Sequence, residues 1–315
     1  MNPDCIIVLG PTASGKTRLA VQIASWLHSE IISADSRQVY RSLNIGTGKD
    51  YHDYSVNGKV VPYHLIDIVD ANEHYDINSF VNDFSTVFGR LASSNKLPVI
   101  CGGSALYIYA LLKNFKYTAI PVNETLRLVL NQKTHSELIG QFKSMPVTDF
   151  HVLADLSTIK RTIRAIEIAS FLNEGNEMEA REDLKLYPLI IGLELNADER
   201  KKRIEKRLLH RLNEGLIEEV KALIENGLST ERLIYFGLEY KFITQFVLNQ
   251  ISYNEMYEKL LTAIVQFSKR QMTFYRKMER EGFNINWIDA TLEPVVQSEL
   301  AWSLIQTYNV TTLSN

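Results

Sequence analysis

The chain has 315 residues, of which 45% are hydrophobic and 23% are charged, a composition typical of a globular protein with room for a main domain and a smaller second unit. A formal net charge of −3 excludes a global basic field, so any nucleic-acid partner would have to meet a local basic patch. No apolar run approaches the ~20 residues that are needed to cross a bilayer, and we expect no membrane partner.

The cysteines and the beginning of the sequence bear on where the protein works. Cys5 and Cys101 both lie in short apolar runs without a cluster of metal-ligating residues, a pattern typical of small core side chains in a reducing compartment. The sequence enters its first predicted strand almost at once, without the charged and apolar regions of a secretory leader. We therefore expect a cytoplasmic protein.

The first motif follows a buried strand, which is predicted from the apolar run of residues 5–9. The next eight residues match G-x-x-x-x-G-K-[ST] at every fixed position, and an amphipathic helix is predicted over residues 15–28. Glycines permit a tight turn whose backbone N–H groups, together with the helix N-terminus, form a cradle for anions. Lys16 adds a positive charge for phosphate oxygens, and the Thr17 hydroxyl is a ligand for Mg²⁺. The residues predicted to bind a di- or triphosphate are Gly10, Pro11, Thr12, Ala13, Ser14, Gly15, Lys16 and Thr17.

Apolar strands then alternate with helices. Three further strands are predicted from short apolar runs, over residues 30–33, 64–68 and 97–101. Helices are predicted to start after a cap at Asp76 and at Ala105. This alternation predicts an α/β protein with a P-loop NTPase-like parallel sheet, flanked by helices on both faces. Ligands of such sheets bind at the carboxyl ends of the strands, and the segments expected there are residues 10–17, 35–38, Asp67 and 102–104.

The pattern changes over residues 116–186, where strand-like runs give way to helical ones. Helices are predicted there over residues 123–133, 136–143 and 158–172. A strand is predicted again over residues 187–193, followed by helices over residues 198–213, 216–226 and 254–281. We therefore expect an all-helical insertion, residues 116–186, within a catalytic core made of residues 1–115 and 187–315.

Two carboxylates come after predicted strands. Asp35 is either an Mg²⁺ ligand or a general base, and a turn residue is the alternative interpretation. A kinase is expected to have an apolar strand that ends in an Mg²⁺-binding Asp. Asp67 fits that pattern loosely, and residues 99–103 contain no acidic residue, which weakens the case for ATP hydrolysis.

Basic residues gather in three places. The first group crowds one predicted helix and consists of Arg200, Lys201, Lys202, Arg203, Lys206, Arg207 and Arg211. Most of these residues are expected on a solvated face, while one or two arginines turned toward the phosphate loop could clamp a pyrophosphate. The other groups are Lys269, Arg270, Arg276, Lys277 and Arg280, and Lys160, Arg161 and Arg164. Three such groups in an acidic protein predict a local footprint for a phosphate backbone.

Several motifs, taken in order, resemble one family. They are residues 10–17, S-A-D-S-R-Q-V-Y at 33–40, I-G-T at 45–47, H-L-I-D at 64–67, G-G-S-A-L-Y at 102–107, residues 161–167, residues 203–207 and K-R-Q-M-T at 269–273. Together they closely resemble the bacterial tRNA dimethylallyltransferases, the tRNA isopentenyltransferases of the IPP transferase family. The resemblance covers nearly the whole chain, and the second and fifth motifs are its most specific parts.

The resemblance implies transfer of a dimethylallyl group from its diphosphate to N6 of the adenosine immediately 3′ of the anticodon in tRNA. It implies that Asp35 takes the N6 proton and that Arg207 contacts the diphosphate of the donor. Thr12, Lys16 and Thr17 would hold the diphosphate with Mg²⁺, Thr17 as the metal ligand. The residues implied to contact tRNA are Asp35, Ser36, Arg37, Gln38, Ser104, Arg127, Lys160, Arg161, Thr162, Ile163 and Arg164.

The sequence also departs from the family pattern. The usual G-T-A-K-P is G-T-G-K-D at residues 46–50, and I-H-P-N-D is replaced by A-D-L-S-T at residues 154–158. The downstream I-G-Y-[KR]-[EQ] is F-G-L-E-Y at residues 236–240, and G-G-T-G-L-Y keeps its hydroxyl as Ser104. Three alternatives stay open: an adenylate isopentenyltransferase, a small-molecule kinase, and a non-catalytic tRNA-binding module. The insertion and the basic C-terminal helix favour tRNA, and we expect a monomer.

Overall fold

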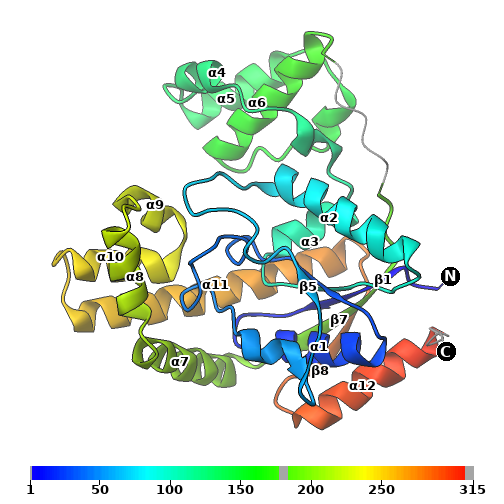
Figure 1. Ribbon diagram of the computed structural model, residues 1–315. Coiled ribbons are helices and arrows are strands. Elements are labelled where there is room, and N and C mark those ends of the chain that lie inside the picture. The colour runs from blue at the N-terminus through cyan, green and yellow to red at the C-terminus, as the bar shows by residue number, and fades with distance from the viewer. Residues whose placement is uncertain (1, 177–183, 309–315) are drawn as a thin grey trace. The chain divides into compact units, whose positions relative to one another are not determined.

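The computed structural model describes residues 2–176 and 184–308, and it divides the chain into two compact units (Figure 1). One unit combines Met1–Lys113 with Lys185–Asn315, and the other is Asn114–Leu184. These boundaries lie close to those expected from the sequence. Each unit has its own hydrophobic core, so each is described by itself.

The larger unit is built on a parallel sheet of six strands in the order β5-β2-β6-β1-β7-β8. The strands are β1 (Cys5–Leu9), β2 (Ile31–Ser33), β5 (Tyr63–His64), β6 (Val99–Cys101), β7 (Pro188–Glu194) and β8 (Ile285–Asp289). In the register of the sheet, Ile7 of β1 lies between Ile100 and Ile190. Every residue of β1 is buried, as expected of a central strand covered on both faces. A separate hairpin joins β3 (Ser55–Val56) to β4 (Lys59–Val60).

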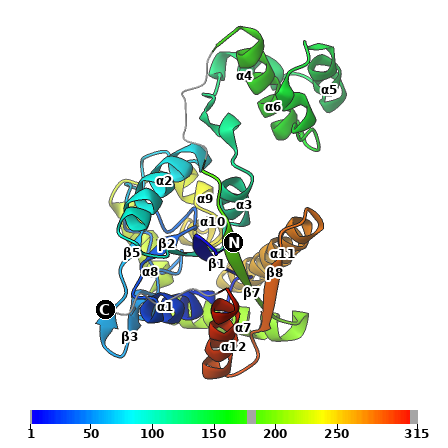
Figure 2. The same cartoon turned by 90° about the vertical axis from the view of Figure 1, so that its right-hand side faces the viewer.

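Helices cover both faces of this sheet, which confirms the predicted α/β class (Figure 2). On one face α1 (Lys16–Trp26) and α12 (Pro294–Thr307) contribute side chains to the core against β1, β6 and β7. On the other face lie α2 (Ile77–Ser93) and α3 (Ala105–Leu112). The Asp76 carboxylate accepts the N–H of Ser79 at 2.9 Å, which confirms the predicted cap of α2.

The remaining helices of the larger unit form a cluster beside the carboxyl ends of the strands. They are α7 (Ala197–Asn213), α8 (Leu216–Glu225), α9 (Thr230–Tyr235), α10 (Leu238–Val247) and α11 (Tyr253–Arg280). Helix α11 contacts α7, α10 and α3, so one long helix connects the cluster to the sheet. A short 3₁₀ helix, Tyr51–Tyr54, packs against α1.

The smaller unit is helical over the part that the structure describes. Its α-helices are α4 (Glu124–Leu130), α5 (His135–Ser144) and α6 (Ile159–Asn173), with 3₁₀ turns at Lys116–Ala119 and Asp149–Val152. Side-chain oxygens of Asn123, Thr134 and Thr158 cap the three α-helices. Buried Leu138 and Phe142 of α5 pack with α6 in a core of its own.

The predicted strand over residues 64–68 is wrong except for its first residue. Strand β5 ends at His64, and Leu65 and Asp67 have left-handed φ values of 62° and 55°. A strand cannot continue through residues in this conformation, so the chain leaves the sheet there. The structure also contains β8 and α12, two elements that the apolar pattern of the sequence did not predict.

Candidate active site

A cavity of about 580 Å³ lies at the carboxyl ends of the strands, within the larger unit. It is lined by the phosphate loop, the turn after β2, the loop that holds Gly46 and Gly48, and the segment after β6. Side chains of α7, α10 and α11 also line it. Of the predicted site residues, the lining includes Thr12, Lys16, Thr17, Asp35, Ser36, Arg37, Gln38, Ser104 and Arg207. Segments far apart in the sequence therefore meet in one place, as expected for a ligand site of a parallel sheet.

The phosphate loop has the geometry that its sequence predicts. Gly15 is left-handed, with φ of 88°, and it caps α1 without a side chain. At Gly10 a Cβ atom would lie 2.8 Å from the carbonyl oxygen of Leu193, so the approach of β7 requires glycine there. Burial lowers the pKa of Lys16, which follows Gly15 at the start of the helix. The loop thus presents a helix N-terminus and an ammonium group to the cavity.

Asp35 serves as a turn residue and also faces the cavity. Its Oδ1 accepts the N–H groups of Arg37 at 2.9 Å and Gln38 at 3.4 Å, which fixes the carboxylate. A Cβ atom on Gly103 would lie 3.5 Å from Oδ2 of Asp35 and 3.7 Å from Nζ of Lys16. The Asp35 carboxylate and the Lys16 ammonium therefore both lie near Gly103. Asp35 can close its turn through Oδ1 and still present Oδ2 to the cavity, so a role in the turn is compatible with a role in the chemistry.

The segment after β6 is held against the turn after β2. The Ser104 hydroxyl accepts the N–H of Ser36 at 2.9 Å, and the two hydroxyl oxygens are 3.2 Å apart. A Cβ atom on Gly102 would lie 2.1 Å from the carbonyl oxygen of Ala34, so a side chain there would force the two segments apart. The hydrogen bond joins two of the predicted tRNA-binding residues, Ser36 and Ser104, next to Asp35.

Two arginines of α7 reach the cavity. Arg207 donates a hydrogen bond to the Thr12 hydroxyl in the phosphate loop. Burial and the positive charge of Arg211 lower the pKa of Arg207 to about 9, so its guanidinium is still charged at neutral pH. Arg211 lies against Gly48 and is 3.8 Å from a carboxylate oxygen of Asp50. Burial raises the pKa of Glu239, which lines the same cavity.

A carboxylate from α8 holds one wall of the cavity. Glu219 accepts the backbone N–H groups of Asn44, Ile45 and Gly46 at 2.7–3.1 Å, and the Tyr240 hydroxyl at 2.7 Å. The amide of Gln38 donates to the carbonyl oxygen of Gly48 at 2.9 Å, which ties the other end of the same loop to the turn after β2. Sequence reasoning missed Glu219, because on a predicted amphipathic helix it is one more polar residue.

Asp67 is placed elsewhere, which corrects its predicted position among the ligand-binding segments. It pairs with the buried Lys49 and accepts a hydrogen bond from the Tyr51 hydroxyl at 2.5 Å, and it does not line the cavity. Because the chain turns out of the sheet at residue 65, the Asp67 carboxylate stabilises the loop that contains Lys49.

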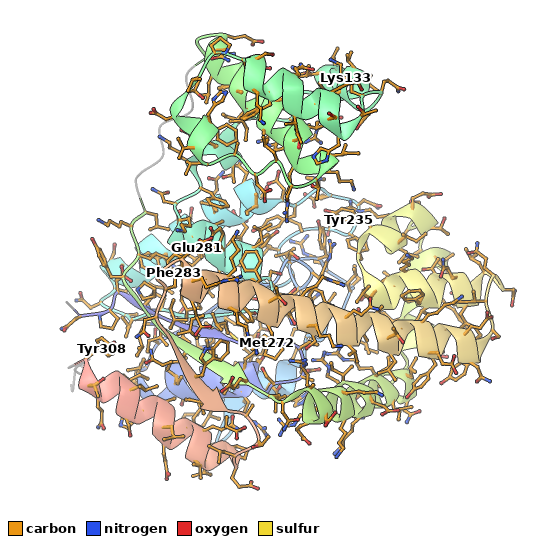
Figure 3. The ribbon with its side chains drawn as sticks, turned by 180° about the vertical axis from the view of Figure 1, so that it is seen from behind. Lys133, Tyr235, Met272, Glu281, Phe283 and Tyr308 are labelled. Atoms are coloured by element: carbon orange, nitrogen blue, oxygen red, sulfur yellow. The ribbon has the colours of Figure 1, made fainter. Side chains whose placement is uncertain are left out.

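Arg37 has a different environment. Its guanidinium carbon lies 4.8 Å from the ring centroid of Tyr235, and Arg232 lies at the same distance from that ring. Figure 3 labels Tyr235. Such contacts between a guanidinium and an aromatic ring are attractive, so they restrict where the Arg37 side chain lies at the cavity. Tyr235 was not predicted as a site residue.

The predicted tRNA-binding residues of the insertion have mixed environments. Arg127 pairs with the buried Glu167 through two hydrogen bonds of 2.8 and 2.9 Å, and Arg164 donates to the carbonyl oxygen of Ile120 at 2.5 Å. The others are Thr162 and Ile163, which are buried, Arg161, which is 3.0 Å from Asp155, and Lys160, which is exposed. The structure thus gives four of these residues a part in holding the unit together, and their contact with tRNA stays a prediction.

Known proteins resemble this chain over nearly its whole length. The family model described as IPP transferase matches residues 38–278, and the one described as isopentenyl transferase matches residues 3–58. The tRNA dimethylallyltransferase 2 of Phocaeicola vulgatus is 46% identical over 97% of this chain and 99% of its own length. The tRNA dimethylallyltransferase 1 of Azobacteroides pseudotrichonymphae is 48% identical, over 91% of this chain and 93% of its own length.

A solved structure shares the fold. The full-length tRNA isopentenylpyrophosphate transferase from Bacillus halodurans superposes with a TM-score of 0.68 at 25% sequence identity, over 97% of each chain. The P-loop-like parallel sheet is therefore common to both proteins. With the family match over most of its length and relatives above 45% identity, this chain belongs to the IPP transferase family.

Proposed function

We propose that this protein transfers a dimethylallyl group from dimethylallyl diphosphate to N6 of the adenosine immediately 3′ of the anticodon in tRNA. The names of its relatives support the reaction. The observation that carries the proposal is that one cavity is lined both by an anion-binding loop and by the Asp35 carboxylate, with Lys16 of the loop and Asp35 both next to Gly103. In the reaction N6 forms a bond to the allylic carbon, the bond from that carbon to the diphosphate oxygen breaks, and the N6 proton passes to a base.

Asp35 is the proposed base. An exocyclic adenine amine is a weak nucleophile, so removal of its proton as the new bond forms assists the reaction, typically by ~10²–10⁴-fold. Because Oδ1 is held by two backbone N–H groups, the direction of Oδ2 is fixed relative to Gly103. A base held in one orientation loses little entropy when the adenine arrives.

The leaving diphosphate is proposed to lie on the phosphate loop. The negative charge that develops as the bond breaks would be stabilised by backbone N–H groups, the Lys16 ammonium and the Arg207 guanidinium, which line this part of the cavity or contact it. The site fits an Mg²⁺ ion, because the Thr17 hydroxyl is an oxygen donor on the cavity and Mg²⁺ in phosphate sites takes most of its other ligands from phosphate oxygens and water. Such an ion, when bound, would add positive charge next to the diphosphate.

The turn after β2 and Ser104 are proposed to receive the target adenosine of the tRNA. An adenine can reach the end of a cavity only if it leaves its stack, which is the general device of enzymes that modify bases. The insertion is proposed to contact tRNA through exposed basic residues, of which Lys160 is the clearest. We also propose that the protein acts as a cytoplasmic monomer; no helix within residues 2–176 and 184–308 is long and apolar enough to span a membrane.

Of the alternatives, a kinase is disfavoured by the residues found at the ends of the strands. Strand β6 ends in Cys101, and Asp67 pairs with Lys49 outside the cavity, so neither supplies the strand-end Mg²⁺ ligand expected of a kinase. An adenylate isopentenyltransferase would use the same donor site. It differs from the proposed enzyme in its acceptor, so an assay with free nucleotide and with tRNA separates the two.

The test is mass analysis of nucleosides after incubation of the protein with Mg²⁺, dimethylallyl diphosphate and either unmodified tRNA or AMP. We expect a five-carbon addition to adenosine in the tRNA digest and none on AMP. Addition to AMP alone would replace the proposal with the free-nucleotide reaction. In a parallel incubation with added ATP, consumption of ATP without any prenylated product would favour the kinase.

A further inference from the structure

Helix α11 contributes one buried amide to the site, that of Gln271. Its Oε1 accepts the N–H of Thr12 in the phosphate loop at 2.9 Å, and its Nε2 donates to the carbonyl oxygen of Gly103 at 2.7 Å. The side chain is 4% exposed and lines the cavity. Met272, the next residue, is also buried; Figure 3 labels it on α11.

The two partners of this amide belong to the two halves of the proposed reaction. Thr12 also receives the hydrogen bond of Arg207, so it belongs to the side that would hold the diphosphate. Gly103 is flanked by Oδ2 of Asp35 and Nζ of Lys16, and the next residue, Ser104, binds the turn that carries Asp35. Gln271 is thus hydrogen-bonded directly to the diphosphate side and to the acceptor side.

The contact pattern requires a side chain with a donor and an acceptor at one end. A backbone N–H and a backbone carbonyl group that face a buried position each need a partner, and a primary amide satisfies both at once. An ionised carboxylate accepts hydrogen bonds and donates none, while a thioether satisfies neither group. Among residues of similar length, glutamine therefore fits this position and glutamate fits it only when protonated.

We propose that Gln271 is a positioning residue, which sets the distance between the donor's diphosphate and the base that activates the acceptor amine. This inference rests on the proposed function. A transfer between two bound substrates depends on their alignment, and a displacement of ~1 Å is enough to cost about 10²-fold in rate. Gln271 holds both segments from one helix, so the alignment does not depend on either substrate.

The experiment compares Gln271→Glu and Gln271→Met with the wild type in the same tRNA assay. We expect kcat to fall by about 10–100-fold in both variants. The KM for tRNA should stay within about 2-fold, because neither variant removes a group that would bind tRNA. A purely structural defect would instead change stability and both kinetic constants together.

The pH profile separates a positioning role from a structural one. In Gln271→Glu the carboxylate accepts from Thr12 and repels the carbonyl oxygen of Gly103, whereas the protonated acid restores both hydrogen bonds. We therefore expect the ratio of variant to wild-type kcat to rise as the pH falls from about 8 to 6: burial raises the pKa of a carboxyl group at this position, and the Lys16 ammonium near Gly103 opposes only part of that rise. For Gln271→Met the ratio should be independent of pH. Dividing by the wild-type rate removes every pH dependence that the variant and the wild type share.

Gln266→Glu is the matched control, because it makes the same chemical change at an exposed position of the same helix. It should behave as the wild type at every pH. A Gln271→Glu ratio that does not change with pH, or unchanged kcat in Gln271→Met, would overturn the inference. If Gln271→Glu does not fold, the split between kcat and KM in Gln271→Met decides. A wild type that forms no prenylated tRNA would instead overturn the proposed function.

Discussion

The two carboxylate oxygens of Asp35 have different roles. Oδ1 completes a turn with the N–H groups of Arg37 and Gln38, and Oδ2 lies on the side of Gly103. Side chains that close a turn are common, and by itself such a contact says nothing of catalysis. The position of the second oxygen near Gly103, on the cavity that the phosphate loop also lines, is what supports the proposed role as a base.

The variant Asp35→Asn separates these roles. Asparagine keeps the oxygen that closes the turn and cannot take the N6 proton at neutral pH, so we expect turnover to fall by about 10²–10⁴-fold. Retention of tRNA on filters should change by no more than about 2-fold. Asp70→Asn, at a carboxylate whose side chain is 67% exposed, is the control and should be fully active. Normal turnover in Asp35→Asn would rule out Asp35 as the base.

Sequence alone predicted much of this site at the level of residues. The phosphate loop, the turn after β2 and Ser104 each follow a strand, and the rule for parallel sheets places such segments together. Asp67 was wrong because the apolar run before it looks like a strand, while the backbone turns left-handed at Leu65. Gln271 lies in a motif that was recognised, but its partners are 259 and 168 residues away, which no local pattern reveals.

At the scale of elements, the loop between β2 and the 3₁₀ helix owes its shape to α8. The Glu219 carboxylate accepts three successive backbone N–H groups, and the Tyr240 ring lies so close to Gly46 that a Cβ atom there would be 2.5 Å from Cζ. A loop without regular structure is thereby fixed at the cavity. Helix periodicity locates α8 and does not reveal that one of its polar residues binds a distant loop.

The variant Glu219→Gln tests this attachment. An amide offers one acceptor oxygen, and its NH₂ group would face backbone donors, so we expect the free energy of unfolding to fall by about 2–3 kcal/mol. Denaturant unfolding measures this change, with Glu218→Gln as the control because Glu218 is exposed on the same helix. A loss equal to that of Glu218→Gln would show that the loop does not depend on this carboxylate.

At the scale of the whole molecule, the two units have separate hydrophobic cores. The core of the smaller unit joins α4, α5 and α6 around residues such as Phe142, and that of the larger unit joins the sheet to α1 and α12. The cavity is lined by the larger unit alone. Donor binding should therefore tolerate damage to the core of the insertion.

The variant Phe142→Ala examines this separation. Removing a buried phenylalanine side chain costs about 3–5 kcal/mol, and here the loss falls on the smaller unit. We expect inorganic pyrophosphate to bind as it does to the wild type in calorimetry, while turnover with tRNA falls. Loss of pyrophosphate binding would mean that the larger unit needs an intact insertion.

The connectivity of the sheet has a consequence for how the chain is made on the ribosome. Strand β1 emerges before every other strand of the sheet, yet one of its two neighbours, β7, begins at Pro188, and the edge strand β8 begins at Ile285. The insertion is contiguous, so its helices are complete before β7 leaves the exit tunnel. During synthesis the apolar central strand must remain without its second neighbour until β7 has been made, which makes this period the one in which a chaperone is most useful.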